Sequence, residues 1–480
     1  MKFYIEKKLE DVFIDILDPN IDNYRDVEGV YDVVGFSPLH LTFENDLLLF
    51  GYFKSKFRDS LFIAGGIEVS SIGKEVFDYA PFDIAVLGEG EETLLKILKA
   101  ILKGKKQFNG IKSIYQRRQG RVYFNGYGKQ LGLSHFKEIY EAYEFINIPY
   151  DRYWKHNAQF YKEPNWTEIR TIRGIFSNFC PYRCKFCAST NFISYSYSGK
   201  LSAGSRFYIL PVKDVIRFIL KITDAWKDVE TIIFDDDNLS LDFQYLKKLC
   251  LEIIQLKEKD KLRKNLSFIC QGRPDVFARS KKKILNLMKN AGFRMIMYGV
   301  ESFSDRVSAY LGKRITRQQA MQTIDATVDA GIVPLIYIIL FPPCILKEDL
   351  IKTVDLCVKY LLKNLEISTT LLIMDIPGSE FYYDTSLRRI IKKYSIAKGI
   401  SIQKSDYIWP SDDELFELGR DIHENYSNYE ENFKQNYGIQ HVPSRVYSFI
   451  VFDAIYQKFG LEDKRKYLHR TLQDVIKNYQ

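Results

Sequence analysis

Residues 168–187, EIRTIRGIFSNFCPYRCKFC, are the most informative stretch of this chain. The first half is a short run rich in Ile and Phe, which is typical of a β-strand. The second half places Cys180, Cys184 and Cys187 at a CxxxCxxC spacing. Three closely spaced thiolates can bind one side of a [4Fe-4S] cubane, which needs a fourth ligand for its remaining iron. That iron is then open to a small molecule, as catalytic metals commonly are.

A structural zinc site is the alternative for these three thiols, with a histidine as the fourth ligand. The sequence offers no histidine nearby, because His156 lies upstream and His423 lies far downstream. The chain has 7 cysteines in 480 residues, too few for a disulfide scaffold. We therefore favour the iron–sulfur interpretation of the cluster.

Working outward from the cysteines, strand-like runs alternate with helical stretches, a pattern typical of parallel strands joined by crossover helices. Six such runs predict a parallel barrel, or part of one, over residues 166–385; they are EIRTIRGIF (168–176), VETIIFDDD (229–237), LSFICQG (266–272), FRMIMYGVES (293–302), PLIYIILFPP (334–343) and LEISTTLLIMD (365–375). In such a barrel, the chemistry takes place at the C-terminal ends of the strands.

The region before the barrel shows the same alternation. Four runs predict a Rossmann-like parallel sheet within residues 1–130; they are VFIDIL (12–17), YDVVGFS (31–37), LFIAGG (61–66) and FDIAVLGEG (82–90). Residues 131–165 have no sustained period and are interpreted as a connector. Residues 386–480 are predicted to be mainly helical. The fold class is therefore α/β, with a Rossmann-like sheet, a partial (β/α)6 barrel and a helical C-terminal region.

Composition excludes several classes of protein. The chain is 46% hydrophobic with a net charge of +8, which is compatible with packed domains and too mild to indicate a nucleic-acid binder. No apolar run reaches the roughly 18 residues that a membrane span needs. The N-terminal stretch lacks the apolar core of a signal peptide. We expect a cytoplasmic protein without membrane or nucleic-acid partners.

With these motifs in view, the chain resembles the radical S-adenosylmethionine (SAM) superfamily, in particular the branch with an N-terminal cobalamin-binding-type domain. The motif CPYRCKFC and the strand ends IIFDDDN, CQGRPD and YGVES carry the resemblance. It implies that SAM chelates the open iron and is cleaved reductively, and that the resulting 5'-deoxyadenosyl radical removes hydrogen from an unactivated carbon. It also implies that Phe186 packs against the adenine, and that a flavodoxin- or ferredoxin-type protein donates the electron.

The resemblance suggests further roles at the strand ends. Asp235 or Asp237 would hold the ammonium of the methionine moiety, although acids at a helix start are often merely solvated. Arg273 has a fork of donors suited to a carboxylate of the cofactor or the substrate, with a surface ion pair as the alternative. Glu301 would approach the ribose hydroxyls.

A cysteine at the barrel rim suggests a reaction outcome. Cys344, in LFPPCILKED (340–349), could donate a thiol hydrogen to a substrate radical, as in radical SAM peptide epimerases. Cys270 is the second candidate for this role, whereas Cys250 and Cys357 have helical spacing typical of core residues. A free cysteine is otherwise a small buried hydrophobe.

The N-terminal domain raises the question of cobalamin. Glycine turns at Gly65, Gly66, Gly88 and Gly90 could let a nucleotide tail approach the backbone. Relatives have an additional strand and helix, and the chain has no DxHxxG stretch, so the domain is expected to be a truncated form; His40 is expected to be structural. The leading hypothesis is modification of a peptide or small-molecule natural product, with epimerisation as one outcome. The alternatives are a cobalamin-dependent C-methyltransferase and an Fe-S or zinc module that binds RNA.

Overall fold

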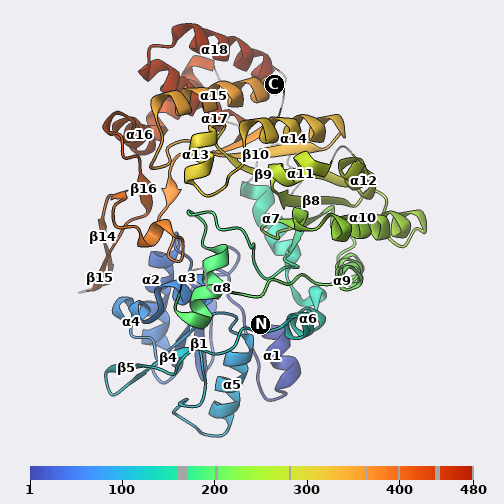
Figure 1. Ribbon diagram of the computed structural model, residues 1–480. Coiled ribbons are helices and arrows are strands. Elements are labelled where there is room, and N and C mark those ends of the chain that lie inside the picture. The colour runs from blue at the N-terminus through green and yellow to red at the C-terminus, as the bar shows by residue number, and fades with distance from the viewer. Residues whose placement is uncertain are drawn as a thin grey trace.

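The structure, a computed structural model, describes residues 1–160, 170–200, 204–280, 283–363, 365–397, 400–437 and 444–477. The N-terminal sheet, the larger parallel sheet and the C-terminal helices follow one another from the bottom to the top of Figure 1. Within these residues, no helix is long and apolar enough to cross a membrane.

The N-terminal domain is a five-stranded sheet in the order β1-β2-β3-β4-β5. Its first three strands are parallel and the last two are antiparallel; they are β1 (Val33–Phe36), β2 (Leu61–Ala64), β3 (Ile84–Val86), β4 (Ile114–Arg118) and β5 (Arg121–Phe124). Five helices accompany the sheet: α1 (Lys2–Lys8), α2 (Phe43–Lys56), α3 (Gly66–Ile72), α4 (Val76–Tyr79) and α5 (Glu91–Leu102). Three of the four predicted strands are therefore present.

The predicted strand at residues 12–17 is wrong. These residues form no regular element, and Phe13 is 89% exposed. An isolated apolar run becomes a strand only where a neighbouring strand and a core receive it, and β1 pairs with β2 alone. The sequence pattern also missed the β4–β5 hairpin. Its turn uses Gln119 and Gly120, both with positive φ, as two-residue hairpin turns require.

The second domain confirms all six predicted barrel strands. They form one parallel sheet in the order β11-β10-β9-β8-β7-β6, comprising β6 (Thr171–Gly174), β7 (Thr231–Phe234), β8 (Ser267–Gly272), β9 (Phe293–Glu301), β10 (Val333–Ile339) and β11 (Glu366–Thr370). The crossover helices are α8 (Ser189–Ser198), α9 (Val212–Ala225), α10 (Phe243–Glu258), α11 (Pro274–Ser280), α12 (Lys283–Ala291), α13 (Asp305–Tyr310), α14 (Arg317–Asp329) and α15 (Lys347–Leu361). Since β6 and β11 do not pair, the barrel is partial.

The remaining segments join these domains. The predicted connector contains two helices, α6 (Leu133–Glu141) and α7 (Tyr150–Phe160). The C-terminal region ends in three helices as expected: α16 (Asp413–Tyr437), α17 (Ser444–Lys458) and α18 (Glu462–Lys477). Before them come short antiparallel strands that the sequence did not indicate: β12 (Ile373–Met374), β13 (Arg388–Arg389), β14 (Lys392–Ala397), β15 (Ile400–Lys404) and β16 (Tyr407–Trp409).

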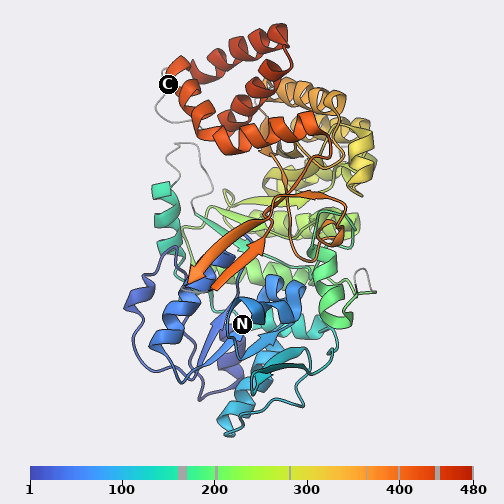
Figure 2. The same cartoon turned by 90° about the vertical axis from the view of Figure 1, so that its left-hand side faces the viewer.

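The β14–β15 hairpin reaches back to the N-terminal domain, where it lies beside α2 (Figure 2). The Lys404 ammonium donates a hydrogen bond of 3.0 Å to the carbonyl of His40, in the loop after β1. The Tyr394 ring packs against the aromatic core of that domain. The chain thus returns to its N-terminal domain after the barrel is complete.

Candidate functional site

The cysteine loop, residues 175–188, leaves the C-terminal end of β6 and leads into α8. Asp236, just after β7, anchors its start. One carboxylate oxygen, Oδ1, accepts hydrogen bonds from Phe176 N (2.8 Å), Ser177 N (2.5 Å) and Ser177 Oγ (2.6 Å). Asp236 is 0% exposed, and burial raises its pKa to about 6. The end of β7 therefore fixes the direction in which the loop departs.

The middle of the loop is attached to a different part of the barrel. Lys185 N donates to the Leu311 carbonyl (2.9 Å), and the Lys185 carbonyl accepts from Phe381 N (3.0 Å). At Gly312, whose φ is 74°, a Cβ would lie 2.9 Å from the Arg183 carbonyl oxygen. Only glycine allows this close approach. The loop is thus held from both sides before any ligand binds.

The three thiols are partly buried on this loop. Burial raises the pKa of Cys180 to about 11 and that of Cys187 to about 12. In the metal-free protein the thiols of Cys180 and Cys187 therefore hold their protons at neutral pH, and metal binding must displace those protons. Among the described residues, no three His, Cys, Asp or Glu side chains are gathered as ligands of a single metal ion. A cubane suits a loop of this kind because each cysteine binds a different iron.

The two predicted aspartates have separate surroundings. Asp237 accepts a hydrogen bond from Ser189 Oγ, which itself accepts from Cys180 N at 3.2 Å. Asp235 accepts from Arg173 Nη1 (3.2 Å) and Gln271 Nε2 (3.4 Å) at the ends of neighbouring strands. Asp237 therefore belongs to the cysteine loop, whereas Asp235 belongs to the strand edge beside it.

Arg273, directly after β8, faces the cysteine loop. Its Nη1 lies 3.9 Å from Cys184 Sγ, and its guanidinium carbon lies 3.8 Å from the centre of the Tyr182 ring. Its remaining donors contact Asp275 (Nε to Oδ1, 3.0 Å) and the Lys313 carbonyl (Nη2, 2.7 Å). The fork predicted to bind a cofactor carboxylate is thus engaged by groups of the protein.

Glu301 ends β9 with a positive φ of 64°. Its carboxylate forms an ion pair with Lys313 (2.8 Å), and both side chains are about 10% exposed. Burial acts to lower the pKa of Lys313, but Glu301 and neighbouring groups hold it above its ordinary value. A Cβ on Gly299 would lie 2.5 Å from both charged atoms. Glycine at this position therefore makes room for the ion pair.

The candidate hydrogen-donor cysteines have different environments. Cys344 is partly buried in the loop after β10, where burial raises its pKa to about 11 against the opposing charge of Arg306. Cys270 is 1% exposed within the barrel core. No substrate can reach Cys270 in this packing, so the geometry removes the support for its predicted role. Cys250 and Cys357 are core residues, as predicted.

The sequence missed several residues that shape this site. Asp236 stands between the two predicted acids, and strand alternation, which favoured Asp235 and Asp237, directs attention away from it. Lys313 and Tyr182 gave no local signal, because their contacts join segments far apart in the chain. Phe186 was predicted, and its side chain packs partly buried against the barrel core.

The glycine turns of the N-terminal domain make room for protein atoms. A Cβ on Gly66 would lie 2.5 Å from Ser37 Oγ, and one on Gly88 would lie 3.1 Å from the side chains of Ser196 and Tyr197. Gly66 and Gly88 are therefore closed by protein atoms, whereas a Cβ on Gly65 or Gly90 would meet nothing closer than 3.4 Å. His40 is buried after β1, with its Nδ1 3.3 Å from Glu68 Oε1 and its Nε2 without a hydrogen-bond partner.

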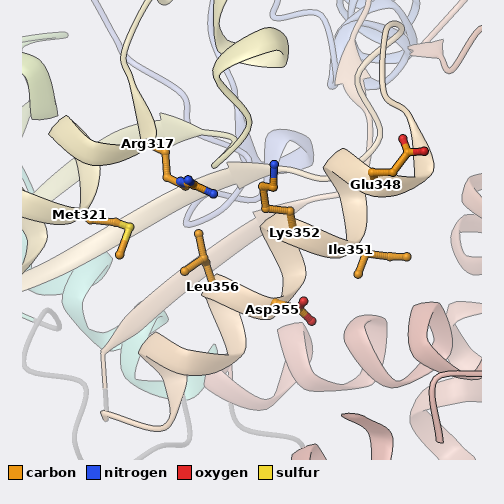
Figure 3. A pocket seen from close by; sticks show the side chains of 7 residues that line it. All are labelled: Arg317, Met321, Glu348, Ile351, Lys352, Asp355 and Leu356. Carbon is orange, nitrogen blue, oxygen red and sulfur yellow. The ribbon is translucent and has the colours of Figure 1, made fainter. Parts of the chain in front are cut away.

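A surface pocket of about 600 Å³ lies away from the cysteine loop. Arg317 and Met321 of α14 line one side, opposite Lys352 and Leu356 of α15 (Figure 3). Both elements are crossover helices, whereas the cysteine loop leaves the end of a strand. This pocket is therefore separate from the predicted chemistry.

Comparison with known proteins agrees with this geometry. Residues 175–357 match the family model of the radical SAM superfamily. The chain carries a radical SAM domain. The match includes the whole CxxxCxxC segment and confirms the prediction of a radical SAM domain. It also covers β7 to β10, whose ends supply the residues around the loop.

A curated relative of the chain is an uncharacterized methyltransferase of Pyrococcus horikoshii, 28% identical over 262 residues. That alignment covers 54% of this chain and 49% of the relative, about half of its length.

Two solved structures share the fold of the chain. The radical SAM methyltransferase TsrM of Kitasatospora setae, with tryptophan and a SAM analogue bound, is 14% identical with a TM-score of 0.59, covering 82% of this chain and 75% of TsrM. The cobalamin-dependent SAM radical enzyme OxsB, with aqua-cobalamin and SAM bound, is 18% identical with a TM-score of 0.60, covering 90% of this chain and 64% of OxsB. Both likenesses concern the fold.

Proposed function

We propose that the chain is a cobalamin-dependent radical SAM methyltransferase that methylates a carbon of a peptide or small-molecule natural product. The observation that carries this proposal is the extent of the structural likeness. TsrM and OxsB match 82% and 90% of the chain, far more than the 175–357 segment, so the likeness extends beyond the radical SAM domain. The name of the curated relative supports methyl transfer.

In this proposal Cys180, Cys184 and Cys187 each bind one iron of a [4Fe-4S] cluster. Once reduced by a flavodoxin- or ferredoxin-type donor, the cluster supplies the electron that cleaves SAM. Phe186, next to the last ligand, packs against the adenine. Asp235 holds the ammonium of the methionine moiety, because its carboxylate is partly exposed at the strand edge.

One residue near β1, His40, is suited to binding the cobalt of cobalamin. The buried His40 Nε2 is unpartnered, and its Nδ1 faces a carboxylate, the arrangement that orients a metal-binding imidazole. His40 would therefore hold the cobalt once the loop after β1 opened to expose its buried Nε2, and the cobalt, as a methyl carrier, would supply the methyl group to the substrate. Protein atoms fill the space at Gly66 and Gly88, so the nucleotide tail would not approach the backbone at these two turns.

Epimerisation is the second candidate, because Cys344 lies partly buried in the loop after β10, at the rim of the barrel. In that reaction the Cys344 thiol would donate hydrogen to a substrate carbon radical. Glu301 is a weaker candidate for a ribose contact, since Lys313 already occupies its carboxylate.

Anaerobic reconstitution tests the proposal. The wild-type chain should bind iron and sulfide, form 5'-deoxyadenosine from SAM with dithionite, and take up hydroxocobalamin stoichiometrically. Cys184→Ala should lose the cluster, whereas the control Cys250→Ala, which removes a thiol from the core, should retain it. A chain that forms 5'-deoxyadenosine but takes up no cobalamin would remove the methyltransferase proposal and leave epimerisation.

Co-expression with peptides encoded by neighbouring genes distinguishes the two reactions. Methylation should add the mass of one CH2 group to the product. Epimerisation should leave the mass unchanged in water and add one deuterium in deuterium oxide.

A further inference from the structure

Arg273 carries a buried positive charge that the proposed cofactor chemistry does not use. Its side chain is 6% exposed at the C-terminal end of β8. A buried charge is costly unless it is paired and hydrogen-bonded. Its counter-ion is Asp275, two residues further along the chain, with Nε to Oδ1 at 3.0 Å and Nη2 to Oδ2 at 3.4 Å. This bidentate pair occupies the edge of the guanidinium that would receive a carboxylate ligand.

Two further contacts fix the plane of the guanidinium, and a third holds the backbone of Arg273. The Tyr182 ring, between the first two cysteines, lies against it with the guanidinium carbon 3.8 Å from the ring centre. Nη2 donates to the Lys313 carbonyl at 2.7 Å, and the backbone nitrogen of Arg273 donates to Ser240 Oγ at 3.3 Å. Arginine suits this position because its planar fork can stack and donate at the same time. Nη1 is thereby directed at Cys184 Sγ, 3.9 Å away.

Two ion pairs lie behind the cysteine loop, and the Arg273 guanidinium is the charged group in contact with Cys184 Sγ. Behind the loop, Lys313 is neutralised by Glu301 at 2.8 Å, and Arg273 is neutralised by Asp275. These four buried charges sum to zero before any cluster binds. When Cys184 becomes a thiolate ligand, the Arg273 guanidinium is therefore in position to donate an N–H···S hydrogen bond to it.

We propose that Arg273 is a positioning residue that raises the reduction potential of the cluster through Cys184. The inference rests on the proposed function, because it requires the three cysteines to bind a [4Fe-4S] cluster. Reduction adds a negative charge that spreads onto the ligand sulfurs. Hydrogen bonds to the sulfurs and nearby positive charge stabilise that form, and both are established determinants of cluster potential. The role predicted for Arg273 as a ligand of the cofactor carboxylate is replaced by this one.

The test is an EPR-monitored redox titration of the reconstituted full-length chain without SAM. Arg273→Met removes the charge and the donor while filling the same space. At a fixed applied potential near the wild-type midpoint, the ratio of reduced to oxidised cluster in Arg273→Met should be about tenfold lower than in the wild type. For a one-electron couple this corresponds to a midpoint potential lower by about 59 mV. Arg273→Lys keeps the positive charge but not the planar fork of donors, so its reduction potential should lie between those of the wild type and Arg273→Met. Arg465→Lys, in an ion pair with Asp453 on the C-terminal helices, is the matched control and should equal the wild type.

Asp275→Asn is a second variant, which should shift the reduction potential in the opposite direction. It removes the counter-ion while leaving Arg273 in place, so the cluster should become easier to reduce. A purely structural role for Arg273 gives no reason for opposite shifts. If Arg273→Met does not assemble a cluster, the Arg273→Lys and Asp275→Asn titrations decide alone.

The possible failures are distinguishable. A wild-type chain that binds no [4Fe-4S] cluster overturns both the proposed function and this inference. A wild-type cluster that cleaves SAM, together with variants that share its potential, overturns this inference alone.

Discussion

Asp236→Asn is the sharpest test of how β7 positions the cysteine loop. All three hydrogen bonds from the loop go to Oδ1, and Oδ2 is buried without a hydrogen-bond partner. Asparagine can keep its carbonyl oxygen at the Oδ1 position. Its NH2 group then replaces Oδ2, where it finds no acceptor. The substitution therefore removes the ionisable group and largely retains the geometry of the loop.

The expected change in the free energy of unfolding follows from the pKa of Asp236, which burial raises from 3.8 to about 6. Asp236 binds its proton more tightly in the folded state than in the unfolded state. Protonation therefore stabilises the fold, and this stabilisation is complete at pH values below the pKa of Asp236 in the unfolded state. That stabilisation is lost as the pH rises through the folded pKa, here between about pH 4 and pH 6. At 1.36 kcal/mol for each pKa unit, the loss is about 3 kcal/mol. The unpaired NH2 group of the variant costs about 1–3 kcal/mol at every pH.

The assay is urea unfolding of the metal-free proteins at several pH values from 4.5 to 7.5. The fluorescence of Trp154 and Trp226 reports on the barrel, because both rings pack against its core. We expect Asp236→Asn to be less stable than the wild type at pH 4.5, and the difference in unfolding free energy to move in favour of the variant by about 2 kcal/mol by pH 7.5, because about 1 kcal/mol of the loss falls below pH 4.5. Other titrating groups cancel in the difference. A difference that stays constant across this range would refute the reasoning.

Three further predictions concern other parts of the site. Gly299→Ala should destabilise the barrel by about 1–3 kcal/mol in urea unfolding, because its Cβ would displace the buried ion pair beside it; Gly35→Ala, with nothing within 4 Å of its Cβ, is the control. Cys344→Ser should leave 5'-deoxyadenosine formation intact and abolish deuterium incorporation from deuterium oxide if the reaction is epimerisation; full incorporation by the variant would discard the donor role. His40→Gln should eliminate the nitrogen hyperfine splitting in the EPR spectrum of bound cob(II)alamin, and an unchanged spectrum would exclude His40 as the ligand.

Much of the barrel was predictable because each of its strands contains a short run rich in apolar residues. Parallel strands covered by helices are continuous apolar runs, and all six were recognised from such runs. The segment at residues 12–17 has a similar composition but no partner strand, and it forms no strand. The hairpins β4–β5 and β14–β15 were missed because their alternating, largely polar residues resemble loops until a neighbouring strand pairs with them.

Local spacing along the chain determined that three cysteines share one loop after a strand, because ligands separated by two or three residues lie close together in any compact loop. The identity of the groups around those cysteines depended on the tertiary structure. Asp236, Arg273 and Lys313 come from the ends of β7, β8 and the segment after α13, which only the assembled parallel sheet brings to one edge. Charges act through space over a few ångströms, so the partners of a buried charge follow from the packing of distant segments.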